Sequence, residues 1–242
     1  MGTRHNPGRD KQLDSARKIA RATEEKFLDP AILFGHASND DLAVYTPEML
    51  AHAAIYAAGE LTTWDRTTAR ISIDTVPFIE FGGTALSVLS ITDRNMPFLY
   101  DSIMGEVTAT YRDIHLAVHP LLTMPAGGEI EPFSAERPGD AADHVSHIQL
   151  HLSPLTSAQS TDLIQRVRSV LDKVHLAISD WQPMLSRLDA TIAELSQYHA
   201  TAGRPILLCW ACATISIRAK VPTPGWSGAK AAVLASSRIR TF

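Results

Sequence analysis

Apolar positions in the middle of the chain follow first the pattern of a buried strand, then that of a helix, and then that of a second strand. Residues 86–91 are largely apolar and β-branched, which predicts a strand buried on both faces. Residues 93–97 are turn formers and place Pro97 where the first residue of a helix belongs. Beyond them, apolar residues recur every four positions, at Leu99, Ile103 and Val107. Residues 114–118 then alternate, so the pattern predicts a β-α-β unit.

Two helices and a strand are predicted before this unit. A thin apolar stripe predicts one helix over residues 10–27. A second helix begins at Thr46-Pro47, because Thr46 can cap it and Pro47 suits its first position. Alternation over residues 70–76 predicts the strand, which ends before a glycine turn.

Behind the unit, residues 125–143 are rich in proline, glycine and acidic groups, so they need no regular structure. Alternation over residues 147–152 predicts another strand, half-buried. Ser157 can cap the next helix, and residues 173–179 can either continue that helix or form a further strand. A last helix is expected from about Pro183, with four apolar residues on one face: Leu185, Leu188, Ile192 and Leu195.

Four short strands with helices between and after them predict an α+β fold, in which an antiparallel sheet carries helices on one face. The expected divisions are an N-terminal helical segment over 1–65, an α+β domain over 66–180, a helix over 181–202 and a basic tail over 203–242.

A set of short motifs in the central unit is similar to a known family. The motifs are Met96-Pro97-Phe98-Leu99, Asp101-Ser102, Ile114-His115 and His119-Pro120. Their order and spacing resemble the N-terminal region of the large bacterial NAD-specific glutamate dehydrogenases, and the likeness extends from about residue 29 to about residue 201. The resemblance implies an ACT-like regulatory domain with a βαββαβ plan, preceded here by a small helical segment.

The segment Asp93-Arg94-Asn95-Met96-Pro97 is the candidate ligand site. It joins a strand end to a helix N-terminus, where backbone N–H groups can hold a carboxylate and Arg94 can assist. The resemblance implies that amino-acid effectors bind this loop. The alternative is that Asn95 merely caps the helix and Asp93 merely forms the turn.

The chain lacks the sequence motifs of a dinucleotide site, a phosphate-binding loop and a zinc protease. We therefore expect no catalytic residue and no cofactor in this chain. For the parent family, the resemblance implies NAD and the conversion of L-glutamate, NAD and water to 2-oxoglutarate, ammonia and NADH. The isolated chain is expected to be inactive. The alternative function is a stand-alone, non-enzymatic module that binds an amino acid and acts through a homo-oligomer.

Two sets of residues raise the question of a metal. His115 and His119 share one strand face, and His147 and His151 share another. Residues four apart on a strand lie about 13 Å apart, so a metal would need one histidine from each pair. Ordinary solvent-facing or interface histidines are favoured, and no metal is expected.

The Cys209–Cys212 pair has the spacing of half a zinc site or a redox pair, but nothing nearby completes either.

The composition and net charge give no support for a nucleic-acid or membrane partner. A net charge of −4 gives no electrostatic reason to propose nucleic acid or an anionic membrane. No apolar run is long enough to span a bilayer, and the first residues lack the apolar core of a signal peptide, so a cytoplasmic location is expected.

The charge pattern changes sharply near the C-terminus. Residues 195–242 contain no acidic residue, although six basic residues are present: Arg204, Arg218, Lys220, Lys230, Arg238 and Arg240. Such a change is typical of a basic arm, of a different domain or of translation in a shifted reading frame. We hypothesise a shifted frame from about Gly203, which truncates the resembled protein there.

Overall fold

The computed structural model describes residues 7–111, 113–125, 128–134 and 143–202. Contacts divide the chain into two units, residues 2–174 and residues from 175 onward. The helices are α1 (Pro7–Ala22), α2 (Pro30–Leu33), α3 (Asn39–Ala43), α4 (Pro47–Thr63), α5 (Leu99–Thr110), α6 (Ser157–Ser179) and α7 (Trp181–Ala202). The strands are β1 (Arg70–Phe81), β2 (Thr84–Arg94), β3 (Ile114–Val118), β4 (Leu121–Thr123), β5 (Glu131–Pro132) and β6 (His144–Leu152).

The predicted start of the second long helix is confirmed in α4. The hydroxyl of Thr46 accepts a hydrogen bond from the backbone N–H of Met49 at 3.3 Å, and Pro47 occupies the first helical position. The first helix, in contrast, ends at Ala22 instead of continuing to Phe27, because Glu24 adopts a left-handed backbone with φ of 59°. Phe27 packs against the core from beyond the helix end.

The described strands form one antiparallel sheet in the order β1-β2-β6-β4-β5, in which β3 also pairs with β6. Gly82 and Gly83, both at positive φ, make the predicted turn between β1 and β2. β3 and β4 follow one another along the same edge of β6, separated by Pro120, which cannot donate a ladder hydrogen bond. β4 and β5 were not expected from the sequence, and β5 lies inside the predicted loop.

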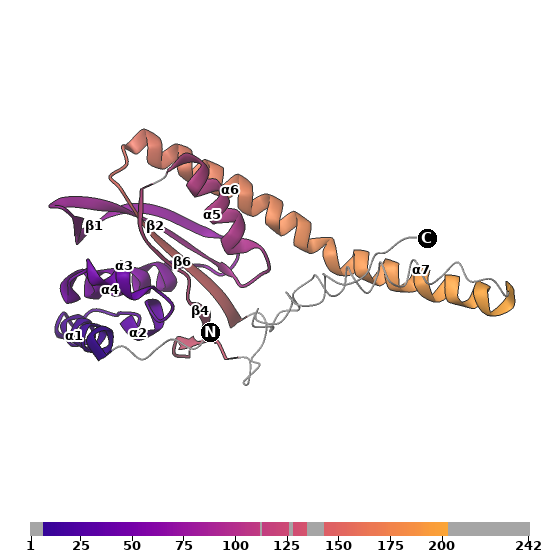
Figure 1. Ribbon diagram of the computed structural model, residues 1–242, viewed down its shortest axis with the longest axis horizontal. Coiled ribbons are helices and arrows are strands. Elements are labelled where there is room, and N and C mark those ends of the chain that lie inside the picture. Colours follow the sequence, from indigo (N-terminus) through magenta and orange to yellow (C-terminus); the bar gives the residue numbers. More distant parts are fainter. Residues whose placement is uncertain (1–6, 112, 126–127, 135–142, 203–242) are drawn as a thin grey trace, which may run out of the picture. The chain divides into compact units, whose positions relative to one another are not determined.

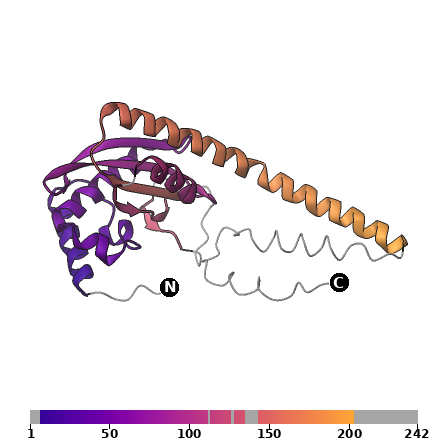
Figure 2. The same cartoon turned by 45° about the horizontal axis from the view of Figure 1, so that its top comes forward.

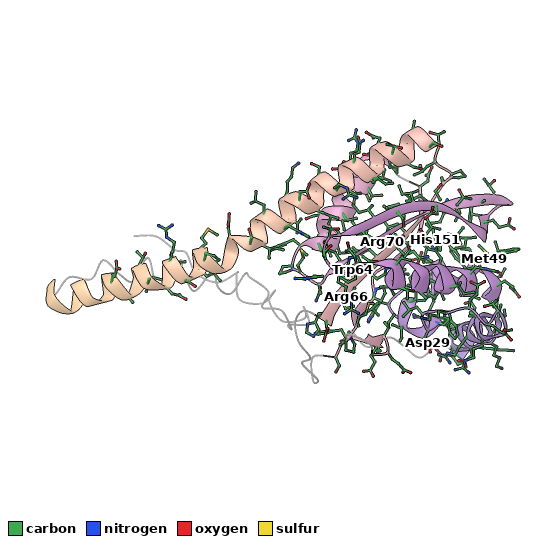
Figure 3. The ribbon with its side chains drawn as sticks, turned by 180° about the vertical axis from the view of Figure 1, so that it is seen from behind. Asp29, Met49, Trp64, Arg66, Arg70 and His151 are labelled. Atoms are coloured by element: carbon green, nitrogen blue, oxygen red, sulfur yellow. The ribbon has the colours of Figure 1, made fainter. Side chains whose placement is uncertain are left out.

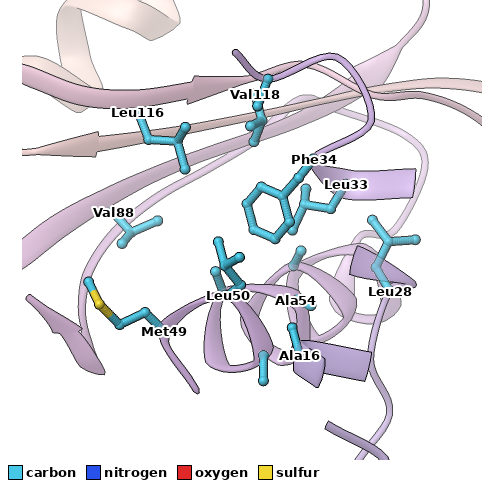
Figure 4. Packing of buried hydrophobic residues seen from close by; sticks show 14 of the residues in the cluster. Ala16, Leu28, Leu33, Phe34, Met49, Leu50, Ala54, Val88, Leu116 and Val118 are labelled. Carbon is cyan, nitrogen blue, oxygen red and sulfur yellow. The ribbon is translucent and has the colours of Figure 1, made fainter. Parts of the chain in front are cut away.

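Helices cover both faces of the sheet in the unit formed by residues 2–174 (Figures 1 and 2). α1 to α4 pack on one face, where Val88, Leu116 and Val118 meet Phe34 and Leu50 in a first core (Figure 4). α5 and the first part of α6 cover the other face and close a second core. The predicted α+β class with its antiparallel sheet is confirmed, and the N-terminal helices supply a second helical layer.

The two central strands, β2 and β6, are buried on both faces. Eight consecutive residues of β2, from Leu86 to Asp93, are buried, as the pattern predicts for residues 86–91. β6 is buried continuously from Val145 to Leu152. The strand predicted over residues 147–152 is confirmed as part of β6, but its predicted half-burial is wrong, because the layer of α1 to α4 covers the face that was expected to meet solvent.

The helix after β6 continues without a break through residues 173–179, so no further strand forms there. The strand that completes the sheet beside β2 is β1, which precedes the central unit in the sequence. The next helix, α7, begins at Trp181, two residues before Pro183.

Replacing Thr46 by alanine is expected to lower the free energy of unfolding by about 1 kcal/mol, because the variant leaves the N–H of Met49 without its cap. The matched control is Thr161→Ala. Its hydroxyl bonds a carbonyl inside α6, where alanine is the better helix former, so stability should stay equal or rise slightly. Urea denaturation of both variants measures the difference. Equal losses in the two variants would contradict a capping role.

Candidate functional site

The predicted ligand segment begins inside β2 rather than in a loop. Asp93 and Arg94 are the last two residues of that strand. Asp93 is 3% exposed and its carboxylate accepts the backbone N–H of Arg94 at 2.8 Å. The side chain of Arg94 is exposed, and its guanidinium donates to the backbone carbonyl of Arg66 at 3.3 Å.

The remaining three residues make the turn into α5. The backbone N–H of Asn95 donates to the carbonyl of His144, which extends the β2–β6 pairing, and Met96 packs against the second core. The predicted helix start at Pro97 is wrong, because α5 begins at Leu99 after Phe98 has turned the chain with φ of 66°. The N-cap position of α5 is occupied by Phe98, and no side chain forms a capping hydrogen bond there. The alternative prediction that Asn95 caps α5 is therefore wrong.

Arg66 connects this segment to a large groove. Its guanidinium donates to the backbone carbonyl of Met124 at 2.7 Å and lies 3.9 Å from the carboxylate of Asp143. Its backbone is left-handed, with φ of 64°, and Asp65 accepts backbone N–H groups just beyond it. Such an outlier for a non-glycine residue stores strain and is common at binding sites.

The groove has a volume of about 800 Å³ and lies between the ends of α1 and α4 and residues 124, 125 and 128–130. Its wall is apolar where Leu61, Trp64 and Ile130 meet it, and its rim carries both signs of charge. Figure 3 places Trp64 and Arg66 beyond the C-terminal end of α4. An apolar wall with a few charged groups suits a small molecule that carries both a cation and an anion.

A second, smaller hollow of about 480 Å³ lies beside α2 and is lined in part by His36, His119 and Phe133. The ring of His119 stacks on Tyr100 with centroids 4.8 Å apart, and its Nε2 bonds the hydroxyl of Ser146. Burial lowers the pKa of His119 to about 4. The residues of the predicted ligand segment line neither cavity.

A chain of buried polar side chains runs along β6 on the face toward α1 to α4. The Thr92 hydroxyl bonds His147 Nδ1 at 2.9 Å, the Gln149 amide nitrogen bonds His151 Nε2 at 3.0 Å, and His151 Nδ1 bonds the Tyr45 hydroxyl at 2.9 Å. His151 lies between the sheet and this helical layer (Figure 3). The expectation of solvent-facing histidines is wrong for His147 and His151, since both are 0% exposed.

The direction of these bonds follows from their chemistry. An amide nitrogen can only donate, so His151 accepts at Nε2 and carries its proton on Nδ1, toward Tyr45. Within the described residues, His147 Nε2 and Gln149 Oε1 have no hydrogen-bond partner. Burial lowers the pKa of His147, and the nearby Gln149 opposes this shift only in part. The two side chains lie two residues apart on one face of β6.

The strand histidines do not form a metal site. His115 Nε2 bonds the hydroxyl of Ser153 at 3.0 Å, and the described residues contain no group of three histidine, cysteine or acidic side chains that could hold a metal ion. Cys209 and Cys212 lie outside the described residues. The helices that the structure describes include none long and apolar enough to cross a membrane.

The antiparallel sheet, its β-α-β centre and its helical layers define an ACT-like α+β protein. The family model described as "Glutamate dehydrogenase, ACT1 domain" matches residues 31–167, more than half of the chain. The chain therefore belongs to this family. The match runs from α2 into α6 and confirms the resemblance carried by the motifs at 96–120. Searches of curated proteins and of solved structures gave no match.

Acid is expected to destabilise the fold through the buried histidines. Burial lowers the pKa of His147 to about 4 and that of His151 to about 3. The unfolded chain binds these protons near pH 6.5 and the folded chain does not. The free energy of unfolding is therefore highest above about pH 6.5 and falls with decreasing pH, by up to about 1.4 kcal/mol per pH unit for each histidine.

Urea titrations between about pH 5 and pH 7 measure this slope. His147→Gln should reduce it by about one proton. An unaltered slope in the His147→Gln variant would show that His147 titrates normally in the folded chain.

Proposed function

We propose that this chain is the N-terminal regulatory segment of an NAD-specific glutamate dehydrogenase, and that it binds an amino-acid effector beside Arg94 and Arg66. The family match over residues 31–167 carries the proposal, because it covers the β-α-β unit and most of the groove wall. In this proposal the chain controls the conversion of glutamate to 2-oxoglutarate with NAD, and the catalytic machinery lies elsewhere in the parent enzyme.

The geometry supports an amino acid as ligand. Arg66 lines the groove, and Arg94 reaches the backbone of Arg66 from the end of β2. The guanidinium of Arg66 suits a carboxylate, since arginine binds planar oxyanions through paired hydrogen bonds, and in this proposal Arg94 adds a second positive charge from the end of β2. Glu25 and Glu129 on the same rim can meet an ammonium group, and the apolar wall can take a side chain.

A panel of the common amino acids tested by calorimetry against the full chain should give saturable binding of at least one. Arg94→Gln should weaken that binding roughly tenfold, because it removes a charge-assisted hydrogen bond to the carboxylate of the bound amino acid. Arg187→Gln, an exposed arginine of α7, is the matched control and should bind like the unaltered chain. Equal affinity of both variants would exclude Arg94 from the site.

The pure chain is expected to form no NADH from glutamate and NAD, because its sequence lacks a dinucleotide-binding fingerprint. A spectrophotometric assay at high protein concentration checks this, with an active glutamate dehydrogenase as positive control. Measurable glutamate-dependent NADH formation would contradict the regulatory assignment.

A stand-alone, non-enzymatic amino-acid-binding module is the second candidate function. One observation favours it. The predicted ligand segment 93–97, Arg66 and the groove all belong to the compact unit of residues 2–174. Sequencing the gene through codon 203 and beyond separates the two functions. A long open frame with a dinucleotide fingerprint after a shift there supports the truncated dehydrogenase, whereas a genuine stop after Phe242 without such a frame supports the module.

A further inference from the structure

Half-buried hydrophobic side chains gather in the groove of about 800 Å³. Among the described residues, six such side chains pack against the first core, and three of the six line this groove: Phe27, Ile32 and Ile130. They come from three segments, namely the connection after α1, helix α2 and the residues before β5. Leu61 and Trp64 line the groove as well and are buried in the first core. The groove therefore offers a ligand an apolar wall that is continuous with the core.

One acidic residue of the groove is already paired. Asp29 lines the groove, and its two carboxylate oxygens accept N–H groups of Arg17 at distances between 2.9 and 3.1 Å. The same carboxylate accepts the backbone N–H of Ala31 at 2.9 Å. Its charge is thus balanced inside the protein, and a cationic ligand side chain gains little from it.

The other charges of the rim balance one another. Apart from Asp29 and Arg66, the charged residues of the lining are all exposed: Arg21, Glu25, Lys26 and Glu129. Two are cations and two are anions, and water screens each of them. The rim therefore has no net charge that would select an acidic or a basic ligand side chain.

Arg66 is a cation of the groove whose position is fixed. Its Nη1 donates to the backbone carbonyl of Met124 at 2.7 Å and lies 3.9 Å from the carboxylate of Asp143. Both contacts are made by this one nitrogen, so within the described residues Nε and Nη2 remain for a ligand. These two nitrogens form the edge of a guanidinium that binds a carboxylate through two parallel hydrogen bonds.

The size of the groove favours a large occupant. Its volume of about 800 Å³ falls within the range of roughly 300–1,000 Å³ that is typical of small-molecule sites. A ligand with only a methyl side chain, anchored at Arg66, would leave the apolar wall in contact with water. A large apolar side chain covers that wall, and the removal of both apolar surfaces from water favours binding.

We infer that the effector bound in this groove is an amino acid with a large, uncharged, apolar side chain, of the class of leucine and phenylalanine. Its side chain packs against Phe27, Ile32 and Ile130, and its α-carboxylate pairs with Arg66. The inference rests on the proposed function, because it narrows the class of amino acid that the regulatory segment binds. Alanine binds more weakly because it cannot cover the wall, and glutamate because a second carboxylate would lose water there.

Calorimetry of the full chain with leucine, phenylalanine, alanine and glutamate tests this specificity. Leucine or phenylalanine should bind at least about tenfold more tightly than alanine or glutamate, because burial of the larger apolar side chain accounts for that factor. If alanine or glutamate binds as tightly as both or more tightly, the inference is overturned and the proposed function stands. If no amino acid of the wider panel binds saturably, both are overturned.

The assigned wall is tested by Ile130→Ala, which should weaken the binding of the preferred amino acid about fivefold and leave the affinity for alanine unchanged. The matched control is Ile19→Ala, since Ile19 is half-buried on the same core and does not line the groove. It should keep both affinities. Arg66→Gln should weaken all amino acids alike, because it removes the partner of the carboxylate. Circular dichroism checks that the variants are folded, and equal losses in Ile130→Ala and Ile19→Ala would overturn the assigned wall.

Discussion

Strand β6 lies in the middle of the sheet between two helical layers, so each of its side chains must find its partners inside the protein. Ile148, Leu150 and Leu152 meet this requirement by packing against α5 and α6. On the opposite face, His151 forms hydrogen bonds through both ring nitrogens and His147 forms one through Nδ1. Buried polar groups cost free energy unless they are paired. The two histidines therefore require hydrogen-bonding partners in the strand or helix that packs against them.

This requirement links the N-terminal helices to the sheet. The partner of His151 is Tyr45, which stands directly before the cap of α4 and belongs to the first core. At the other end of α4, Glu60 holds Arg70 at 2.9 Å and accepts from the Ser72 hydroxyl at 2.6 Å. Polar contacts to β6 and β1 thus fix both ends of α4, while apolar packing fills the space between them. The groove beside Arg66 begins where α4 ends, so its shape depends on the same attachment.

Local patterns predicted the elements well and their surroundings less well. The Thr46–Pro47 helix start rests on interactions within a few residues. The buried run of β2 and the α6 helix follow from the spacing of apolar residues along the chain, and the structure confirms all three. The burial of His151 depends on Tyr45, which lies 106 residues away in the sequence. No periodicity along β6 can reveal such a partner. The groove was missed for the same reason, because its wall combines α1, α4 and residues 124, 125 and 128–130.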